Sequence, residues 1–355
     1  FRLYLKKKEI RYKKGMRKWI YITFGVVFTL FLVHAFFNFH YGIAIASAIF
    51  FPAFFLVFLY NIDVFERERF KDILLVFLMS FCVSFLTCLL WVPLRELLLI
   101  NFEPGFFHML FGAGLPEELI KIIPVLIVLK KTKLINEPID YLIYASSSAL
   151  GFAFMENIDY IYMFRESSPN IIAIRSLLPT FMHMACSSVF AFGIFFYMET
   201  KKIKYLFIFY FIAAATHAFY NSYLTHLIII FIILYYARLI RALISISPFY
   251  DEKKIKLLKK GAYILGASFV ALHVVNIAFI TYYGEFYKLK ASQQIWFTEF
   301  IYLFFALVFY KIISYNLNIN KGEFKILGKR KIKLFSEMQQ TVIKNYYAKI
   351  NFHEK

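Results

Sequence analysis

The chain has 355 residues, of which 61% are hydrophobic and 21% aromatic, and its formal net charge is +19. A soluble domain averages roughly 45–50% apolar residues, so the composition excludes an ordinary soluble protein. It predicts an all-α fold, a polytopic membrane helix bundle whose basic residues face the cytoplasm and the lipid bilayer rather than nucleic acid.

Apolar runs of about 20 residues, long enough to cross a bilayer, recur along most of the chain. The first follows a segment with nine Lys and Arg residues in 18, and it is too long for the apolar part of a cleavable signal peptide. The stretch 94–106 is interrupted by charges and Pro104, and we expect an interfacial turn there. We predict about ten transmembrane helices, at 19–38, 43–60, 72–93, 107–129, 140–163, 177–198, 205–224, 226–244, 262–283 and 295–313.

The distribution of basic residues supports this topology. With the N-terminus in the cytoplasm, 35 of the 41 Lys and Arg residues fall on the cytoplasmic side and five fall in outer loops. One helix too many or too few would place every later loop on the opposite side of the membrane and destroy this asymmetry. We therefore expect N- and C-termini in the cytoplasm of a multi-pass cell-membrane protein. The richness in Phe, Ile, Lys and Asn favours a bacterial cytoplasmic membrane.

Small residues are concentrated in the fifth, sixth and seventh predicted helices, at 145–149, 185–188 and 213–215. Small residues let membrane helices approach closely, so these helices and the polar fourth should form the inner core. We divide the chain into a basic N-terminal segment with helices 1–3 (1–106), a candidate catalytic core of helices 4–7 (107–224), helices 8–10 (225–315) and a basic cytoplasmic tail (316–355).

The predicted fourth helix carries Glu117 and Glu118, with Lys121 one turn further on. A charge at the bilayer centre costs at least roughly 2.5–3.5 kcal/mol, so such residues indicate a functional site. Either glutamate can pair with Lys121, which leaves the other free or makes the three a proton-sharing group. The alternative is a buried structural ion pair, which gives the second glutamate no purpose.

The fifth predicted helix contains Glu156, Asn157 and Tyr160, with Glu156 and Tyr160 on one face. Asp159 lies nearer the outer end, and we expect it to reach water at the headgroups. Glu156 lies deeper and is the stronger candidate for chemistry.

Two histidines follow in the next helices, His183 in the sixth and His217 in the seventh, with Asn221 one turn after His217. A lone histidine on an apolar face is usually a packing residue. Counting roughly 1.5 Å per residue from the cytoplasmic ends, however, Glu117, Glu156 and the two histidines all lie about 18–24 Å deep. The sequence therefore predicts one layer of ionisable groups in the outer half of the membrane.

These motifs, taken in order, resemble those of the PrsW family of intramembrane proteases, which is related to the CAAX-protease and bacteriocin-processing superfamily. The resemblance covers about 112–221 and rests on Glu117-Glu118-x-x-Lys121, Glu156-Asn157-x-x-Tyr160, His183 and His217-x-x-x-Asn221. It implies hydrolysis of peptide bonds in membrane-protein or peptide substrates such as anti-sigma factors.

By position, the resemblance assigns Glu117 as the glutamate that activates water, with Glu118 beside it. It assigns the two histidines as essential and Asn221 as the polar residue one turn beyond. The wider superfamily has an arginine four residues after its second glutamate. This chain has Lys121 three residues after it, which fits PrsW and argues against prenyl-protein processing. The Phe-x-x-x-His pattern expected ahead of His183 is missing.

Two mechanisms remain open for these residues. In the favoured one, no cofactor is needed: Glu117 is a general base on water, and the histidines and Asn221 orient the water and stabilise the oxyanion. In the other, His183, His217 and Glu156 bind Zn²⁺, which acidifies a bound water. The candidate catalytic residues are thus Glu117, Glu118, Glu156, His183, His217 and Asn221, with Lys121, Asn157 and Tyr160 in support.

Two further functions use the same residues. A proton-coupled transporter would employ the carboxylates as a relay. The sequence shows neither the internal repeat nor the paired broken helices typical of transporters, which counts against it. The other alternative is a catalytically inactive relative with a regulatory role.

Overall fold

The computed structural model describes residues 39–98, 104–132, 134–163, 169–222, 225–286 and 292–324, together with 340, 341 and 344. This part of the chain contains helices and no strand, which confirms the all-α class. In lipid a helix satisfies its own backbone hydrogen bonds, which explains why these apolar segments are helical. The elements are α2 (Phe39–Ile62), α3 (Phe70–Leu98), α4 (Phe106–Met109), the π-helical turn η1 (Leu110–Gly114), α5 (Leu115–Lys131), α6 (Pro138–Met163), α7 (Pro169–Thr200), α8 (Lys204–Asn221), α9 (Thr225–Ser245), α10 (Glu252–Phe286) and α11 (Ser292–Asn316).

Each predicted span from residue 43 onward overlaps a helix, whereas the first predicted span, 19–38, and most of the basic tail lie outside the described residues. The turn expected from residue 94 is wrong for its first part, because α3 continues to Leu98. Leu, Arg and Glu are good helix formers, so charges end the apolar run without ending the helix. The predicted fourth helix is made of three successive elements, α4, η1 and α5.

Three of the described helices contain apolar stretches long enough to cross a membrane: Phe70–Thr87 in α3, Leu177–Thr200 in α7 and Ile228–Ser245 in α9. Large apolar side chains also lie exposed on the surface, among them Leu86, Phe207 and Phe211. An exposed apolar surface of this kind indicates contact with lipid. The protein is therefore a membrane protein.

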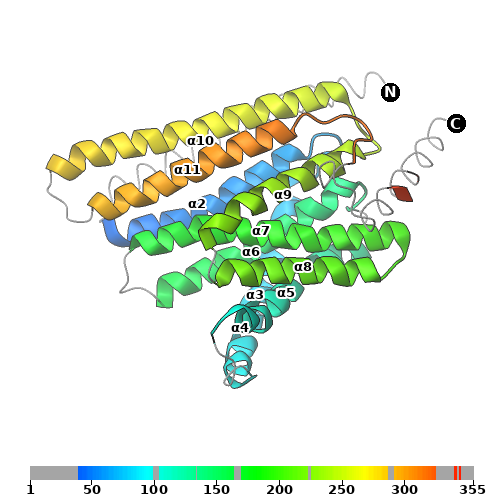
Figure 1. Ribbon diagram of the computed structural model, residues 1–355, viewed down its shortest axis with the longest axis horizontal. Helices are drawn as coiled ribbons and strands as arrows, with labels where there is room; N and C mark the ends of the chain where they lie inside the picture. Colours follow the sequence, from blue (N-terminus) through cyan, green and yellow to red (C-terminus); the bar gives the residue numbers. More distant parts are fainter. Residues whose placement is uncertain are drawn as a thin grey trace.

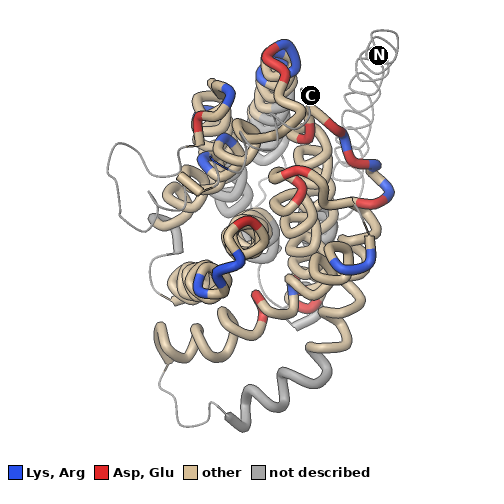
Figure 2. Tube along the Cα trace, turned by 90° about the vertical axis from the view of Figure 1, so that its right-hand side faces the viewer, with Lys and Arg blue, Asp and Glu red and all other residues tan. Residues whose placement is uncertain are grey.

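The long helices lie side by side, with α10 and α11 on one side of the bundle and α8 on the other (Figure 1). Helix α6 packs against α7, α3 and α2, and α7 also packs against α8 and α2. Helices α6 and α7 thus form the middle of the bundle. Figure 2 looks onto the end with the α7–α8 and α9–α10 connections and shows charged residues on the chain there.

Three consecutive serines join α6 to its neighbours. Ser146 Oγ lies 2.8 Å from Ser188 Oγ on α7, Ser147 donates to the backbone carbonyl of Ile73 on α3 at 2.6 Å, and Ser148 donates to that of Lys121 on α5 at 2.5 Å. All three serines are fully buried. Small hydroxyl residues permit both close packing and hydrogen bonds between membrane helices. The hydrogen bond of Ser148 fixes α5, which carries the glutamate pair, against α6.

Candidate active site

The glutamate pair begins α5 directly after the π-helical turn η1. Such turns are rare and often occur at functional sites. Gly114 ends η1, and a Cβ atom there would overlap the backbone carbonyl oxygen of Ala214 on α8. Only glycine permits this approach. It brings Glu117 and Glu118 to the helix that carries His217.

Glu118 is completely buried, and both of its carboxylate oxygens have partners. Oε1 accepts hydrogen bonds from Lys121 Nζ at 2.9 Å and from His217 Nδ1 at 3.1 Å. Oε2 accepts one from Ser187 Oγ on α7 at 2.8 Å. A buried carboxylate needs such partners, and here they come from three helices. Glu118 therefore holds α5, α7 and α8 together.

Lys121 is also completely buried, and its ammonium group lies among the candidate residues. Besides Glu118, Nζ lies 2.7 Å from Nδ1 of His183 and 3.4 Å from Oε2 of Glu117. It also lies 4.2 Å from the ring centroid of Phe152, which adds a cation–π contact. The lysine thus places one positive charge between both glutamates and His183.

His183 has partners at both ring nitrogens. An ammonium group has no acceptor, so His183 Nδ1 accepts from Lys121, and the ring proton is on Nε2. That nitrogen lies 2.8 Å from Oε2 of Glu156 and donates to it. Glu156 is 22% exposed at its side chain, whereas His183 is 2% exposed. The histidine thus connects the buried lysine to a carboxylate at the edge of the site.

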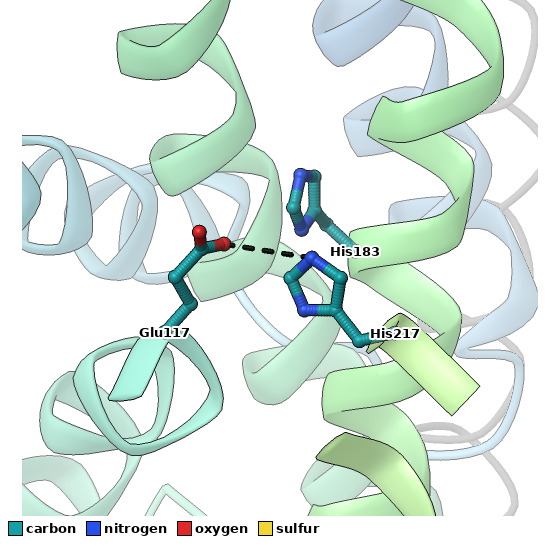
Figure 3. A group of neighbouring side chains, drawn as sticks. All are labelled: Glu117, His183 and His217. Atoms are coloured by element: carbon teal, nitrogen blue, oxygen red, sulfur yellow. Dashed lines mark ion pairs between the residues drawn. The ribbon is translucent and has the colours of Figure 1, made fainter. Parts of the chain in front are cut away.

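Glu117 and His217 face each other across the site (Figure 3). Their Oε2 and Nε2 atoms are 3.6 Å apart, longer than a hydrogen bond. In the tautomer in which Nδ1 of His217 donates to Glu118, its Nε2 carries the lone pair. Among the described residues this buried atom has no hydrogen-bond partner. A carboxylate that is 17% exposed and an imidazole lone pair therefore converge on one point, as activation of water requires.

A comparison with protein-family models identifies the family of this chain. A family model described as "PrsW family intramembrane metalloprotease" matches residues 68–244, which include every residue of the cluster. The chain belongs to the PrsW family. Membership implies intramembrane protease activity. A search of curated proteins and a search of solved structures each found no match.

The description of the PrsW family as metalloproteases can be tested on these side chains. One atom each of Glu117, His183 and His217 lie within 4.8 Å of one another. Tetrahedral Zn²⁺ separates neighbouring ligands by roughly 3.3 Å, close to the Glu117–His217 distance. The bond from His217 Nδ1 to Glu118 is also the usual support for a metal-bound histidine. To bind the same ion, His183 would have to give up its hydrogen bond with Lys121 or with Glu156, because both of its ring nitrogens are occupied. The residues thus fit a zinc ion, with Glu117 in the place expected of Glu156.

The structure also describes the other residues predicted in this PrsW-family site, Asn157, Tyr160 and Asn221. Asn157 is buried and binds Thr180 Oγ1 at 3.2 Å, so it joins α6 to α7. Tyr160 is half-buried, one turn beyond Glu156. Asn221 is the half-buried last residue of α8, and no hydrogen bond between described atoms ties it to the cluster. Asp159 is half-buried near the end of α6.

Two contributors were missing from the predicted site, Ser187 and Phe152. Ser187 lies one helical turn after His183 and therefore on the same face, a spacing that could have indicated it. Phe152 lies one turn before Glu156 and packs against the ring of His183 at 5.2 Å between centroids. Phenylalanine is so common in this chain that no sequence signal singles it out.

Proposed function

We propose that the chain is an intramembrane endopeptidase whose hydrolytic centre is formed by Glu117 and His217. The observation that carries this proposal is the partly exposed Glu117 carboxylate facing Nε2 of a buried histidine, an atom with no hydrogen-bond partner in the described part of the chain. Both atoms accept hydrogen bonds, so together they orient a water molecule whose oxygen points at a substrate carbonyl.

In the proposed reaction Glu117 is the general base. It takes a proton from water while the water oxygen bonds to the carbonyl carbon and the C=O electron pair moves to oxygen. The tetrahedral intermediate then collapses, the C–N bond breaks, and Glu117 returns the proton to the leaving amine nitrogen. His217 Nε2 holds the second water hydrogen throughout. Asn221, one turn beyond His217, supplies the amide that binds the developing oxyanion.

Glu118 and Lys121 are positioning residues in this scheme. Glu118 fixes the ring of His217 and the tautomer that leaves Nε2 open. Lys121 fixes His183 and places its charge near Glu117. His183 in turn orients Glu156, the second partly exposed carboxylate. These contacts support a preorganised site rather than a scattered set of packing residues.

A zinc-dependent mechanism is the second candidate, and the lone pair of His217 Nε2 supports it as well. Glu117, His183 and His217 would hold the ion, which would lower the pKa of a bound water. In that case Glu156, released by His183, is the carboxylate available for proton transfer. Both candidates catalyse the same hydrolysis.

We also propose the setting of the reaction. The protein is a multi-pass protein of a bacterial cytoplasmic membrane with about ten helices and both termini in the cytoplasm, so the site lies in the outer half of the bilayer. Its substrates are membrane proteins cut near the outer face, and the resemblance favours substrates like anti-sigma factors. The positive charge at the predicted cytoplasmic connections supports this orientation.

The test is a cleavage assay on a tagged library of single-span membrane proteins in vesicles. It compares wild type with Glu117→Gln and His217→Ala. Asp159→Asn is the matched control, because it removes a partly exposed carboxylate from α6 outside the cluster. We expect cleavage by wild type and the control, and none by the other two variants.

Other outcomes contradict the proposal. If Glu117→Gln abolishes proton-dependent uptake of a solute and no fragment forms, the protein is a transporter. If wild type cuts nothing and both variants support the wild-type phenotype in cells, it is an inactive relative.

A further inference from the structure

Three carboxylates outside the active site come together at the far end of α6. Asp63 follows the last residue of α2, Glu137 precedes α6, and Asp140 lies in the first turn of α6. One oxygen of each lies within 4.8 Å of the others. Their exposed fractions are 0%, 2% and 0%, respectively. Three acids buried together are costly without a compensating charge, so this arrangement requires an explanation.

The hydrogen bonds of the cluster leave two oxygens open. Asp63 Oδ2 accepts from the backbone N–H of Glu68, and Asp140 Oδ2 accepts from the N–H of Glu137 at 2.8 Å. Asp63 Oδ1 and Asp140 Oδ1 are buried, and neither has a hydrogen-bond partner in the described chain. Buried acceptors are nearly always paired, so these two atoms point to a ligand.

The surroundings would hold such a ligand in place. Ser247, after α9, donates a hydrogen bond to Glu137 Oε2, and Glu66 N–H lies 3.4 Å from its Oε1. Arg67 and Lys254 bring positive charge close to the cluster: Arg67 Nε donates to the backbone carbonyl of Asp63 and Lys254 Nζ to that of Phe65.

We propose that Asp63, Glu137 and Asp140 form a site for a hard divalent cation, of the Ca²⁺, Mg²⁺ and Mn²⁺ class. All available donors are oxygens, which these ions prefer and which disfavour softer metals. Ca²⁺ bonds oxygen at 2.3–2.6 Å and so spaces its ligands by roughly 3–5 Å, which suits this cluster. The cation satisfies the two open oxygens and offsets the three negative charges.

The site is separate from the hydrolytic centre. Asp140 precedes Glu156 on α6 by 16 residues, roughly 24 Å of helix. The cation would join the α2–α3 connection, the start of α6 and, through Ser247, the α9–α10 connection. Its role is to hold these segments together at the predicted cytoplasmic end of the bundle.

The experiment uses the full-length protein in detergent, stripped of metal with a chelator that is then removed. Bound Mn²⁺ is counted by electron paramagnetic resonance, and thermal unfolding is followed with and without Ca²⁺ or Mg²⁺. The variants are Asp63→Asn and Asp140→Asn, which remove charge with little change of shape. His217→Ala excludes binding at the active site, and Glu252→Gln controls for a surface acid that is 72% exposed.

We expect wild type, His217→Ala and Glu252→Gln to bind one Mn²⁺ and to unfold several degrees higher with Ca²⁺. Both Asn variants should bind Mn²⁺ at least tenfold more weakly and lose the Ca²⁺ shift. The proposal is overturned if wild type shows neither binding nor a shift, whether or not the variants fold. It is equally overturned if the Asn variants bind as wild type does, or if His217→Ala alone removes the ion. A wild type stabilised by acid but by no cation would show that the cluster holds protons instead.

Discussion

His217 Nδ1 and Glu118 Oε1 lie 3.1 Å apart, and both side chains are completely buried. This contact separates the roles of two adjacent glutamates. Glu118 is enclosed by donors, whereas its neighbour Glu117 is partly exposed and faces the other nitrogen of the same histidine. Glu117, the proposed general base, and Glu118, a buried structural carboxylate, are thus adjacent in sequence but lie in different environments.

Glu117→Gln should abolish cleavage while preserving the fold. The amide keeps the size of the side chain and an acceptor for Lys121, but it cannot take a proton from water. General-base catalysis contributes roughly 10²–10⁴-fold, so we expect cleavage to fall at least hundredfold. The measurement is initial cleavage rate in vesicles together with thermal unfolding. Cleavage within tenfold of wild type would exclude Glu117 as the base.

Lys121→Met should destabilise the protein as well as inactivate it. The variant keeps an unbranched apolar side chain but leaves the buried Glu118 without its cation. Removing one partner of a buried pair costs about 3–5 kcal/mol. Unfolding in detergent measures this loss, with Lys256→Met as control, because Lys256 is 76% exposed and pairs only at the surface. Equal stability of the two variants would contradict the central position of Lys121.

Gly114→Ala should reduce cleavage by moving α5 away from α8. The added methyl group meets the backbone carbonyl of Ala214, which cannot rotate aside as a side chain could. Because Glu117 and His217 lie on these two helices, the distance between them should increase. Cleavage rate and a cysteine cross-link between α5 and α8 would both report the change. Wild-type cleavage by the variant would show that the helices have room.

Chelation separates the two mechanisms. With Glu117 as a general base, cleavage should survive dialysis against a strong zinc chelator and remain sensitive to Glu117→Gln. Loss of cleavage on dialysis and its recovery with Zn²⁺, but not with Ca²⁺ or Mg²⁺, would assign the ion to Glu117, His183 and His217. Including Ca²⁺ throughout keeps the separate oxygen-rich cluster from influencing the result.

The contribution of Glu137 to the stability of the cation-free protein should fall as pH rises from about 4.5 to about 7. Burial raises the pKa of Glu137 to about 7 from 4.5, against the hydrogen bond from Ser247 and the charge of Lys254, which lower it. Burial and Glu137 likewise raise the pKa of Asp63. The folded state therefore keeps a proton that the unfolded state releases in this window, and the loss is on the order of 3 kcal/mol.

Unfolding measured between pH 5 and 8 tests this slope. Saturating Ca²⁺ should remove or reverse it, because the cation and the proton compete for Asp63, Glu137 and Asp140. Glu137→Gln should flatten it without added cation. A difference in stability between cation-free wild type and Glu137→Gln that does not change with pH in this window would contradict the environment assigned to Glu137.

The helix positions could be predicted because apolar run length alone determines which segments suit lipid. Charged residues were a poorer guide to helix ends, as the continuation of α3 to Leu98 shows. Counting residues along each helix also predicted that Glu117, Glu156, His183 and His217 lie at one depth. The contacts of Glu118 and Lys121 with the histidines follow from that layer.

The division of roles within the site could not be predicted. Which glutamate is enclosed depends on the rotation of α5 about its axis, which depends on η1 and on the contact at Gly114. The cluster of Asp63, Glu137 and Asp140 was missed because Asp63 comes from the α2–α3 connection, far in sequence from Glu137 and Asp140 at the start of α6. Sequence spacing reports neighbours on one helix, and it carries no information on which loops meet.

The π-helical turn Leu110–Gly114 gives the glutamates a direction that an uninterrupted α-helix would not. A π turn accommodates one surplus residue, and each residue of an α-helix advances by about 100°. Deleting a single residue from this turn, such as Phe111, would therefore remove the surplus and leave Glu117 and Glu118 facing in nearly the same direction. Winding all the same residues as a regular α-helix would instead rotate both glutamates relative to α4 and away from His217, with every proposed catalytic side chain still present.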